Sequence, residues 1–331
     1  MSPPPEALPI GKRTLADLEQ TLGSAVTEMT EFDSLASRVY AVTLADGQQV
    51  VVKVPQVEQG SLSEPRLIEL VDEGSDVSVP TVLALREEYE PSYFVMNRIE
   101  GETVEAVATL EPAERLALAR EVGAILGDLH GLSLPVSTFG RIRADEAGDL
   151  QTIEEFESWR PRFEDLMSVN LDALAELRLG DLALRLHEAF DERIPNIPDV
   201  TTPRLNYFDC KPTNLVLSRD GDGPLIRAVL DWEGLSTTHW AFTLAYADRN
   251  LVEWPGDADP GERDRLREAL YDAYAAARGW EELELGAWYD TYRLATYSLV
   301  AASPYWLEDR DDWDDEKAAR LRRRIERFLD D

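Results

Sequence analysis

Residues 205–217 read Leu-Asn-Tyr-Phe-Asp-Cys-Lys-Pro-Thr-Asn-Leu-Val-Leu, and residues 228–233 read Ala-Val-Leu-Asp-Trp-Glu. Asp209 falls in a turn-rich loop, Asn214 begins a predicted strand over 214–218, and Asp231 follows a second predicted strand over 225–230. Oxygen ligands at the ends of paired strands can hold a hard cation such as Mg²⁺ beside a carboxylate that accepts a proton. The alternative is turn chemistry, because Asp and Asn in loops commonly hydrogen-bond their own backbone.

The first hundred residues read as strands around one main helix. Runs of β-branched residues predict strands over 37–44 and 48–54, and Asp46-Gly47 between them is a strong hairpin signal. Apolar residues at helical spacing predict a helix over 62–71, and two more strands are predicted over 81–85 and 92–97.

Beyond residues 100–102 the pattern becomes helical. A long helix is predicted over 112–132, two further helices over 153–190, and mostly helix over 240–331. We therefore expect an α+β fold with a small β-rich N-terminal lobe over 1–97 and a larger, mostly helical C-terminal lobe over 98–331.

The charge of the chain limits the class of partner. Among 331 residues there are 33 Lys plus Arg and 65 Asp plus Glu, which gives a formal net charge of −32. A nucleic-acid partner is excluded, because neutralising phosphates needs clustered basic residues. Lysine is scarce, at Lys12, Lys53, Lys211 and Lys317. Such an acidic surface indicates a salt-adapted, halophilic protein, and the alternative is an ordinary acidic cytosolic protein.

The cysteine content and the apolar segments indicate the cellular compartment of the protein. The single cysteine, Cys210, cannot form an intrachain disulfide, and we expect it to be buried. The N-terminus has no basic, apolar signal sequence, and the longest apolar stretch, over 294–307, is too short to span a bilayer. We expect a cytoplasmic protein without a membrane partner, either a monomer or a homodimer.

The segment over 205–233 resembles the catalytic and metal loops of the protein-kinase-like superfamily, and most closely the aminoglycoside phosphotransferase family of small-molecule kinases. The kinase order of catalytic-loop Asp, then Asn, then metal-binding Asp matches Asp209, Asn214 and Asp231. The resemblance implies a bilobal protein-kinase-like fold, with Asp209 catalytic and Mg²⁺ on Asn214 and Asp231. Lys211 resembles a lysine of kinase catalytic loops that could neutralise the transferring phosphoryl group, and the alternative is a solvated loop lysine.

One lysine interrupts the apolar strand over 50–54. Burying the ammonium of Lys53 is costly unless it meets an anion, although on an edge strand it could reach solvent. In the family, the lysine of this strand contacts ATP phosphates and pairs with a glutamate on the next helix. The resemblance makes Glu64 that partner.

Two further nucleotide contacts are implied by the resemblance. Residues 94–101 are similar to the segment that joins the lobes, where backbone groups around Asn97 to Ile99 would bind adenine. The phosphate loop is expected over 30–39, which contains no glycine. Backbone amides would approach the phosphates there with help from the Ser34 and Ser37 hydroxyls.

The resemblance implies ATP-dependent transfer of the γ-phosphate to a hydroxyl of a small molecule, such as an aminoglycoside, an amino alcohol or a sugar. Two alternatives stay open: a non-catalytic nucleotide-binding protein with a kinase-like fold, and a protein kinase. The sequence departs from the family at Tyr207-Phe208, where His-Gly is usual. Five acidic residues could face a cationic acceptor: Glu154, Glu155, Glu157, Asp248 and Glu253.

Overall fold

The computed structural model describes residues 10–32, 37–55, 63–219, 223–253, 259–303 and 314–330. The chain forms two compact units. Unit 1 consists of residues 1–103, 143–151 and 214–234, and unit 2 of residues 104–142, 152–213 and 235–331. The domain boundary after residue 97 stays a prediction, and unit 1 differs from the expected lobe by including two later segments of chain.

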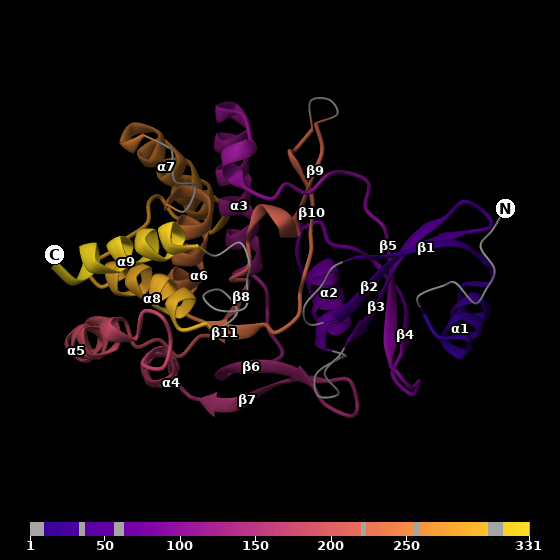
Figure 1. The fold of residues 1–331 in the computed structure, drawn as a ribbon, viewed down its shortest axis with the longest axis horizontal. Helices are drawn as coiled ribbons and strands as arrows, with labels where there is room; N and C mark the ends of the chain where they lie inside the picture. The colour runs from indigo at the N-terminus through magenta and orange to yellow at the C-terminus, as the bar shows by residue number, and fades with distance from the viewer. Residues whose placement is uncertain are drawn as a thin grey trace. The chain divides into compact units, whose positions relative to one another are not determined.

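Unit 1 is built on an antiparallel sheet whose strands lie in the order β1-β2-β3-β5-β4 (Figure 1). The strands are β1 (Val26–Phe32), β2 (Ser37–Leu44), β3 (Gln49–Pro55), β4 (Val82–Arg86) and β5 (Tyr93–Asn97). The predicted β2–β3 hairpin is confirmed, and Gly47 supplies the positive φ of 90° that its turn requires. The predicted strands β4 and β5 are also confirmed.

The alternation of side chains along β2 and β3 divides the sheet into two faces. Tyr40 and Val42 of β2 share a buried cluster with Val50 and Val52 of β3. Helix α1 (Lys12–Leu22) covers this cluster with Leu18. Because successive strand residues face opposite sides, the side chain at position 53 points away from α1.

The other helix of unit 1 is α2 (Ser63–Gly74), which confirms the predicted helix. Helix α1 was not expected, although Leu15, Leu18 and Leu22 recur at the spacing of an amphipathic helix.

The segment over 214–234 adds a small hairpin to unit 1. Strands β9 (Leu215–Leu217) and β10 (Ile226–Val229) pair antiparallel, as the sequence predicts. Leu217 exchanges two backbone hydrogen bonds with Glu102, and the Val229 amide donates to the Ser78 carbonyl at 2.9 Å. These bonds place Asn214 and Asp231 in the same unit as β3.

A second sheet, in the order β7-β6-β11-β8, belongs mostly to unit 2. Its strands are β6 (Phe139–Ala144), β7 (Leu150–Phe156), β8 (Arg204–Asn206) and β11 (Ser236–Thr238). The prediction that 153–190 holds only helices is therefore wrong at its start. Leu150, Ile153 and Phe156 recur every third residue, which mimics a helical stripe, whereas pairing with β6 makes them a strand.

Helices make up most of unit 2, as expected (Figure 1). They are α3 (Pro112–Leu129), α4 (Trp159–Leu174), α5 (Ala183–Arg193), α6 (Trp240–Ala247), α7 (Pro260–Ala277), α8 (Tyr289–Ala301) and α9 (Asp315–Asp330), with short turns η2 (Val107–Thr109), η3 (Gly180–Leu182), η4 (Ile194–Asn196) and η5 (Pro212–Asn214) and a π-helix η6 (Asp248–Glu253).

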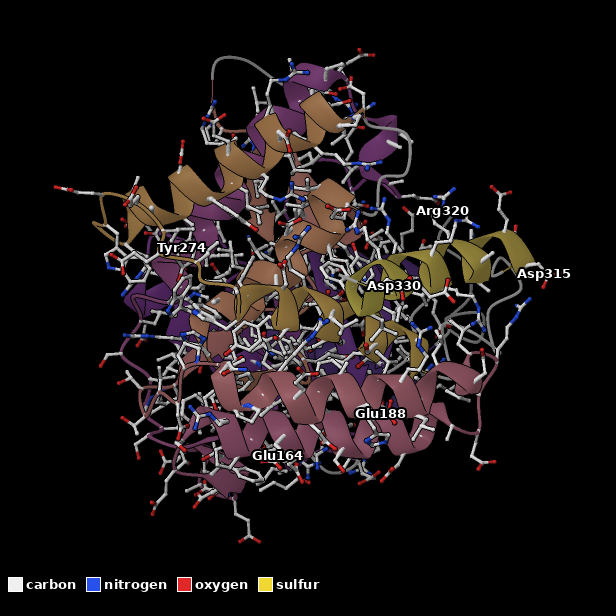
Figure 2. The ribbon with its side chains drawn as sticks, turned by 90° about the vertical axis from the view of Figure 1, so that its left-hand side faces the viewer. Glu164, Glu188, Tyr274, Asp315, Arg320 and Asp330 are labelled. Atoms are coloured by element: carbon white, nitrogen blue, oxygen red, sulfur yellow. The ribbon has the colours of Figure 1, made fainter. Side chains whose placement is uncertain are left out.

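Aromatic side chains fill the centre of unit 2. Trp159 and Phe163 of α4 pack against Phe242 of α6 and Tyr292 of α8, with ring centroids 5.2–6.3 Å apart. Acidic and basic side chains such as Glu164, Glu188 and Asp315 point outward from the helices (Figure 2). Within the part of the chain that the structure describes, no helix combines the length and apolarity needed to cross a bilayer.

Helix α3 packs closely on α7. A Cβ at Gly123 would collide with the Leu270 carbonyl oxygen, so this contact requires glycine.

His130 caps the end of α3 and is buried. Its Nε2 donates to the Leu205 carbonyl at 3.2 Å, so its Nδ1 is the acceptor for the Tyr274 hydroxyl at 2.7 Å. Burial lowers the pKa of His130 to about 3. The ring thus has a structural role in the core and fixes the strand that leads to Asp209.

Because the buried ring stays neutral, the unfolded chain binds one more proton than the folded protein between about pH 6.5 and 3. Acidification through this window should lower the free energy of unfolding by up to about 1.4 kcal/mol per pH unit on account of His130. We expect His130→Gln to show a shallower loss of stability than the wild type between pH 6.5 and 4.5, measured by urea unfolding. Equal slopes in the two proteins would contradict the neutral assignment.

Candidate functional site

Lys53 is the centre of a cluster of carboxylates in unit 1. Strand β3 lies in the middle of the sheet, so the alternative of an edge-strand lysine is ruled out. The Lys53 side chain is 7% exposed, and its Nζ lies 2.7 Å from Glu64 Oε2 and 2.8 Å from Glu233 Oε2. Asp231 Oδ1 is farther away, at 3.5 Å. The predicted Lys53–Glu64 pair therefore exists in the structure.

The electrostatics of the cluster favour a charged lysine. Burial disfavours the ammonium, but Glu64, Asp231 and Glu233 outweigh that cost and raise the pKa of Lys53. Burial also raises the pKa of Glu64, to about 7, against the opposing effect of Lys53. Three carboxylates thus surround one ammonium, an excess of up to two negative charges. Such an excess is stabilised by an added cation.

Asn214 and Asp231 have the chemistry of a magnesium site. Asn214 Nδ2 lies 3.5 Å from Asp231 Oδ2, and the Asp231 side chain is 37% exposed. Hard oxygen donors of this kind suit Mg²⁺, which also keeps several waters. Asp231 adopts a positive φ of 65°, an unfavourable conformation for a residue with a Cβ. Among the described residues, no group of three or more His, Cys, Asp or Glu side chains is placed to hold a metal ion.

Asp209 and Lys211 lie in unit 2, in the loop after β8. Lys211 Nζ lies 2.7 Å from Asp209 Oδ2, and the Lys211 amide donates to the Asp209 carbonyl at 2.8 Å. Both side chains are partly exposed, at 36% and 28%. Cys210 between them is buried, as expected, and burial raises the pKa of its thiol to about 12.

The other predicted nucleotide contacts have mixed outcomes. Ser34 lies outside the described residues. The Ser37 hydroxyl donates to Glu233 at 3.0 Å, and residues 30–32 and 37–39 belong to strands, so the loop is shorter than expected. The Asn97 amide donates to the Thr81 carbonyl at 3.1 Å and is used within the sheet. Ile99, half-buried beyond β5, stays a prediction.

Glu233 is a member of the cluster around Lys53 that the sequence analysis missed. Its carboxylate contacts both Lys53 and Ser37. The signal was its place two residues after Asp231 in the Asp-Trp-Glu stretch. Between them, the Trp232 side chain is fully buried and its backbone amide lies 3.4 Å from Glu64 Oε1.

The suggestion that Asp248 and Glu253 face a cationic acceptor is wrong. Both are buried, and Arg267 contacts each of them. Glu253 also contacts Arg293, Arg324 and Arg327. Neither carboxylate is available for a substrate. Glu154 contacts Arg141 at 2.7 Å on the surface.

The comparisons with known proteins concern the family and the fold of the chain. A model of the phosphotransferase enzyme family matches residues 28–285. A search of curated protein sequences gives no match.

Several solved structures share the fold. One is from Ralstonia eutropha and was assigned as an aminoglycoside phosphotransferase, with a TM-score of 0.67 and 15% identity over 96% of this chain and 95% of that chain. Another is the aminoglycoside phosphotransferase APH(4)-Ia, with a TM-score of 0.65 and 16% identity over 96% and 99% of the two chains. The macrolide 2'-phosphotransferase MphH from Brachybacterium faecium has a TM-score of 0.60 and 16% identity over 93% and 97%. The expected α+β, protein-kinase-like fold is therefore confirmed.

The Lys53–Glu64 pair generates a stability prediction. Lys53→Met leaves the Glu64 carboxylate buried without its partner, so we expect a loss of about 3 kcal/mol in the free energy of unfolding at pH 8. The loss should be smaller at pH 6, because a neutral carboxyl group needs no partner. The double variant Lys53→Met/Glu64→Gln should recover most of the loss.

Urea unfolding of the single and double variants provides the measurement. Arg322→Ala, which breaks the exposed pair with Asp181, is the control and should cost less than about 1 kcal/mol. Additive effects of the two core substitutions would show that the pair is not coupled.

Proposed function

The chain belongs to the phosphotransferase enzyme family, and from that membership we propose that it transfers the γ-phosphate of ATP to a hydroxyl group of a small molecule. The observation that carries the proposal is the cluster in unit 1. It joins a buried ammonium to Glu64 and to the Asp-Trp-Glu segment, which are the parts that phosphoryl transfer from a nucleotide requires.

Lys53 would bind the α- and β-phosphates through its ammonium. Glu64 would orient it from α2, and Glu233 would hold it in the absence of nucleotide. Asn214 and Asp231 would hold Mg²⁺, which when bound offsets charge between the β- and γ-phosphates. The excess of negative charge around Lys53 supports this assignment, because a bare scaffold gains nothing from three carboxylates on one ammonium.

Asp209 would accept the hydroxyl proton of the small molecule. Its carboxylate is partly exposed, so an acceptor can reach it. Lys211 pairs with this carboxylate and would turn to the transferring phosphoryl group when the phosphates arrive. Positioning and electrostatics would supply most of the rate enhancement.

The similar structures indicate that the phosphate acceptor is a small molecule. The similar structures include an aminoglycoside phosphotransferase that was crystallised with ADP and hygromycin B, with a TM-score of 0.58 and 16% identity. For this chain we propose a hydroxyl-bearing small molecule. The arginines around Asp248 and Glu253 argue against a cationic group bound by that pair.

Replacement of Asp209 tests the catalytic role. Asp209→Asn should lower kcat by about 10²–10⁴-fold, because the amide cannot take the proton, while the KM for ATP changes little. The assay is ADP release with a panel of aminoglycoside, amino-alcohol and sugar acceptors, at low and at molar salt. A rate equal to the wild type with an accepted substrate would remove Asp209 from the mechanism.

Thermal stability tests the nucleotide and metal site without knowledge of the acceptor. ATP should raise the Tm of the wild type, and Mg²⁺ should increase that shift. Asp231→Asn should lose the magnesium-dependent part, because an amide is a weaker ligand than a carboxylate. Asp181→Asn, on the surface of unit 2, is the matched control and should keep it. No shift of the wild type with ATP would favour a different donor or a non-catalytic protein.

A further inference from the structure

The π-helix η6 ends α6 beside the loop that carries Asp209. π-helices are rare and are often found at functional sites, because the extra residue in the turn redirects side chains. Here the turn contains Asp248, Arg249, Asn250 and Glu253. Its side chains divide into two sets, one directed to the Asp209 loop and one directed to the helices behind it.

Asn250 is the residue that contacts the loop. Its Nδ2 lies 3.5 Å from the carbonyl oxygen of Phe208, the residue before Asp209. Asn250 therefore contacts the backbone directly before Asp209.

Arg249 fixes which way the Asn250 amide faces. The Nε and Nη2 atoms of Arg249 donate to Asn250 Oδ1 at 3.1 and 2.9 Å. Since the oxygen is occupied, the NH₂ group must turn to the Phe208 carbonyl. Arg249 also donates to the Thr296 carbonyl and lies 5.0 Å from the Tyr246 ring, which packs against the Phe208 ring at 5.8 Å.

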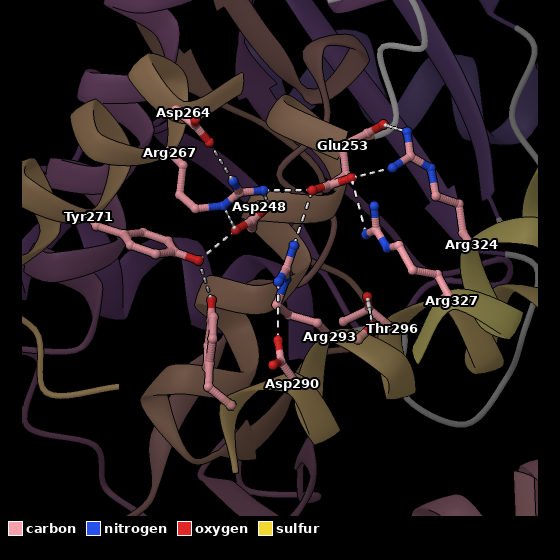
Figure 3. A network of polar contacts seen from close by, with 11 residues as sticks. Asp248, Glu253, Asp264, Arg267, Tyr271, Asp290, Arg293, Thr296, Arg324 and Arg327 are labelled. Carbon is pink, nitrogen blue, oxygen red and sulfur yellow. Dashed lines mark hydrogen bonds and ion pairs between the residues drawn. The ribbon is translucent and has the colours of Figure 1, made fainter. Parts of the chain in front are cut away.

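Carboxylates at the two ends of η6 anchor it to three helices (Figure 3). Asp248 accepts from Arg267 at 2.8 Å and from the Tyr271 hydroxyl, both on α7. Glu253 contacts four guanidinium groups, those of Arg267 on α7, Arg293 on α8, and Arg324 and Arg327 on α9. Burial opposes ionisation of Glu253, but these arginines outweigh it and lower the pKa of Glu253.

Removing one partner from such a network is costly, because it leaves a buried charge without compensation. The contacts hold η6 against α7, α8 and α9. Asn250 lies in this turn, so its position depends on these contacts.

We propose that Asn250 is a positioning residue for the Asp209 loop, held in place by Arg249 and by the arginine network around Glu253. The inference rests on the proposed role of Asp209 as proton acceptor. Asn250 acts through its contact with the backbone carbonyl of Phe208, directly before Asp209, so its loss should displace the carboxylate from the acceptor hydroxyl and leave the nucleotide site of unit 1 intact.

The test uses two substitutions in the full-length protein. Asn250→Asp is isosteric and keeps an acceptor for Arg249, but it replaces the donor to the Phe208 carbonyl with an oxygen. Asn250→Leu removes both contacts. We expect both variants to lower kcat at least tenfold per folded molecule, with the KM for ATP within twofold of wild type and with the ATP-induced shift of Tm retained.

Asn170→Asp is the matched control, because Asn170 donates to the Leu166 carbonyl within α4, remote in sequence from the loop. It should leave kcat unchanged. The folded fraction of every variant is measured by near-UV circular dichroism before kinetics. If kcat per folded molecule is unchanged in the Asn250 variants, or if the KM for ATP rises as much as kcat falls, the positioning role is overturned.

Asp209→Asn separates the two proposals. If Asp209→Asn abolishes turnover while the Asn250 variants retain it, the positioning role alone fails. If Asp209→Asn retains turnover, the proposed function of the loop fails, and the positioning role fails with it.

Discussion

The buried ammonium of Lys53 is the constraint on which unit 1 depends. A lysine in the middle of a central strand is tolerated only where carboxylates meet it. Glu64 comes from α2, and Glu233 comes from a segment 180 positions later along the chain. The need to neutralise one cation thus brings residues 231–233 into the same unit as the N-terminal sheet. The same carboxylates then exceed the charge that they neutralise, which favours an added cation.

Local signals in the sequence were sufficient for much of the fold. The hairpin at Asp46-Gly47 and the helix over 62–71 depend on nearest neighbours, so the sequence predicts them well. The Lys53–Glu64 pair could also be predicted, because a family pattern supplied the partner. Strands β6 and β7 could not, since apolar residues at every third position suit a helix until a neighbouring strand pairs with them.

Long-range contacts decided the remainder of the site. The sequence gives no sign that Glu233 returns to Lys53, or that Glu253 faces four arginines from three helices. In an acidic chain such contacts are difficult to predict, because the sequence does not distinguish a paired carboxylate from an exposed one. Only the three-dimensional arrangement separates the buried, paired acids from those that point to solvent.

The division between lysine and arginine has a physical basis. Arginine presents a planar fork with five donors, so several can share one carboxylate, as around Glu253. Lysine is a compact charge that can move between a carboxylate and a phosphate. With only four lysines in the chain, two are Lys53 and Lys211, next to the acidic residues of the proposed site. Structural cations here are arginines, and the cations proposed to meet phosphate are lysines.

The loop of Asp209 is held mainly through its backbone. His130 donates to the Leu205 carbonyl, and Asn250 Nδ2 lies 3.5 Å from the Phe208 carbonyl oxygen. A carbonyl oxygen is present whichever side chain the residue carries, so these contacts do not depend on the identity of positions 207 and 208. The same carbonyl oxygens would be present with the His-Gly that is usual in the resembled family. Residues outside the loop, at the end of α3 and on η6, therefore contribute to the placement of Asp209.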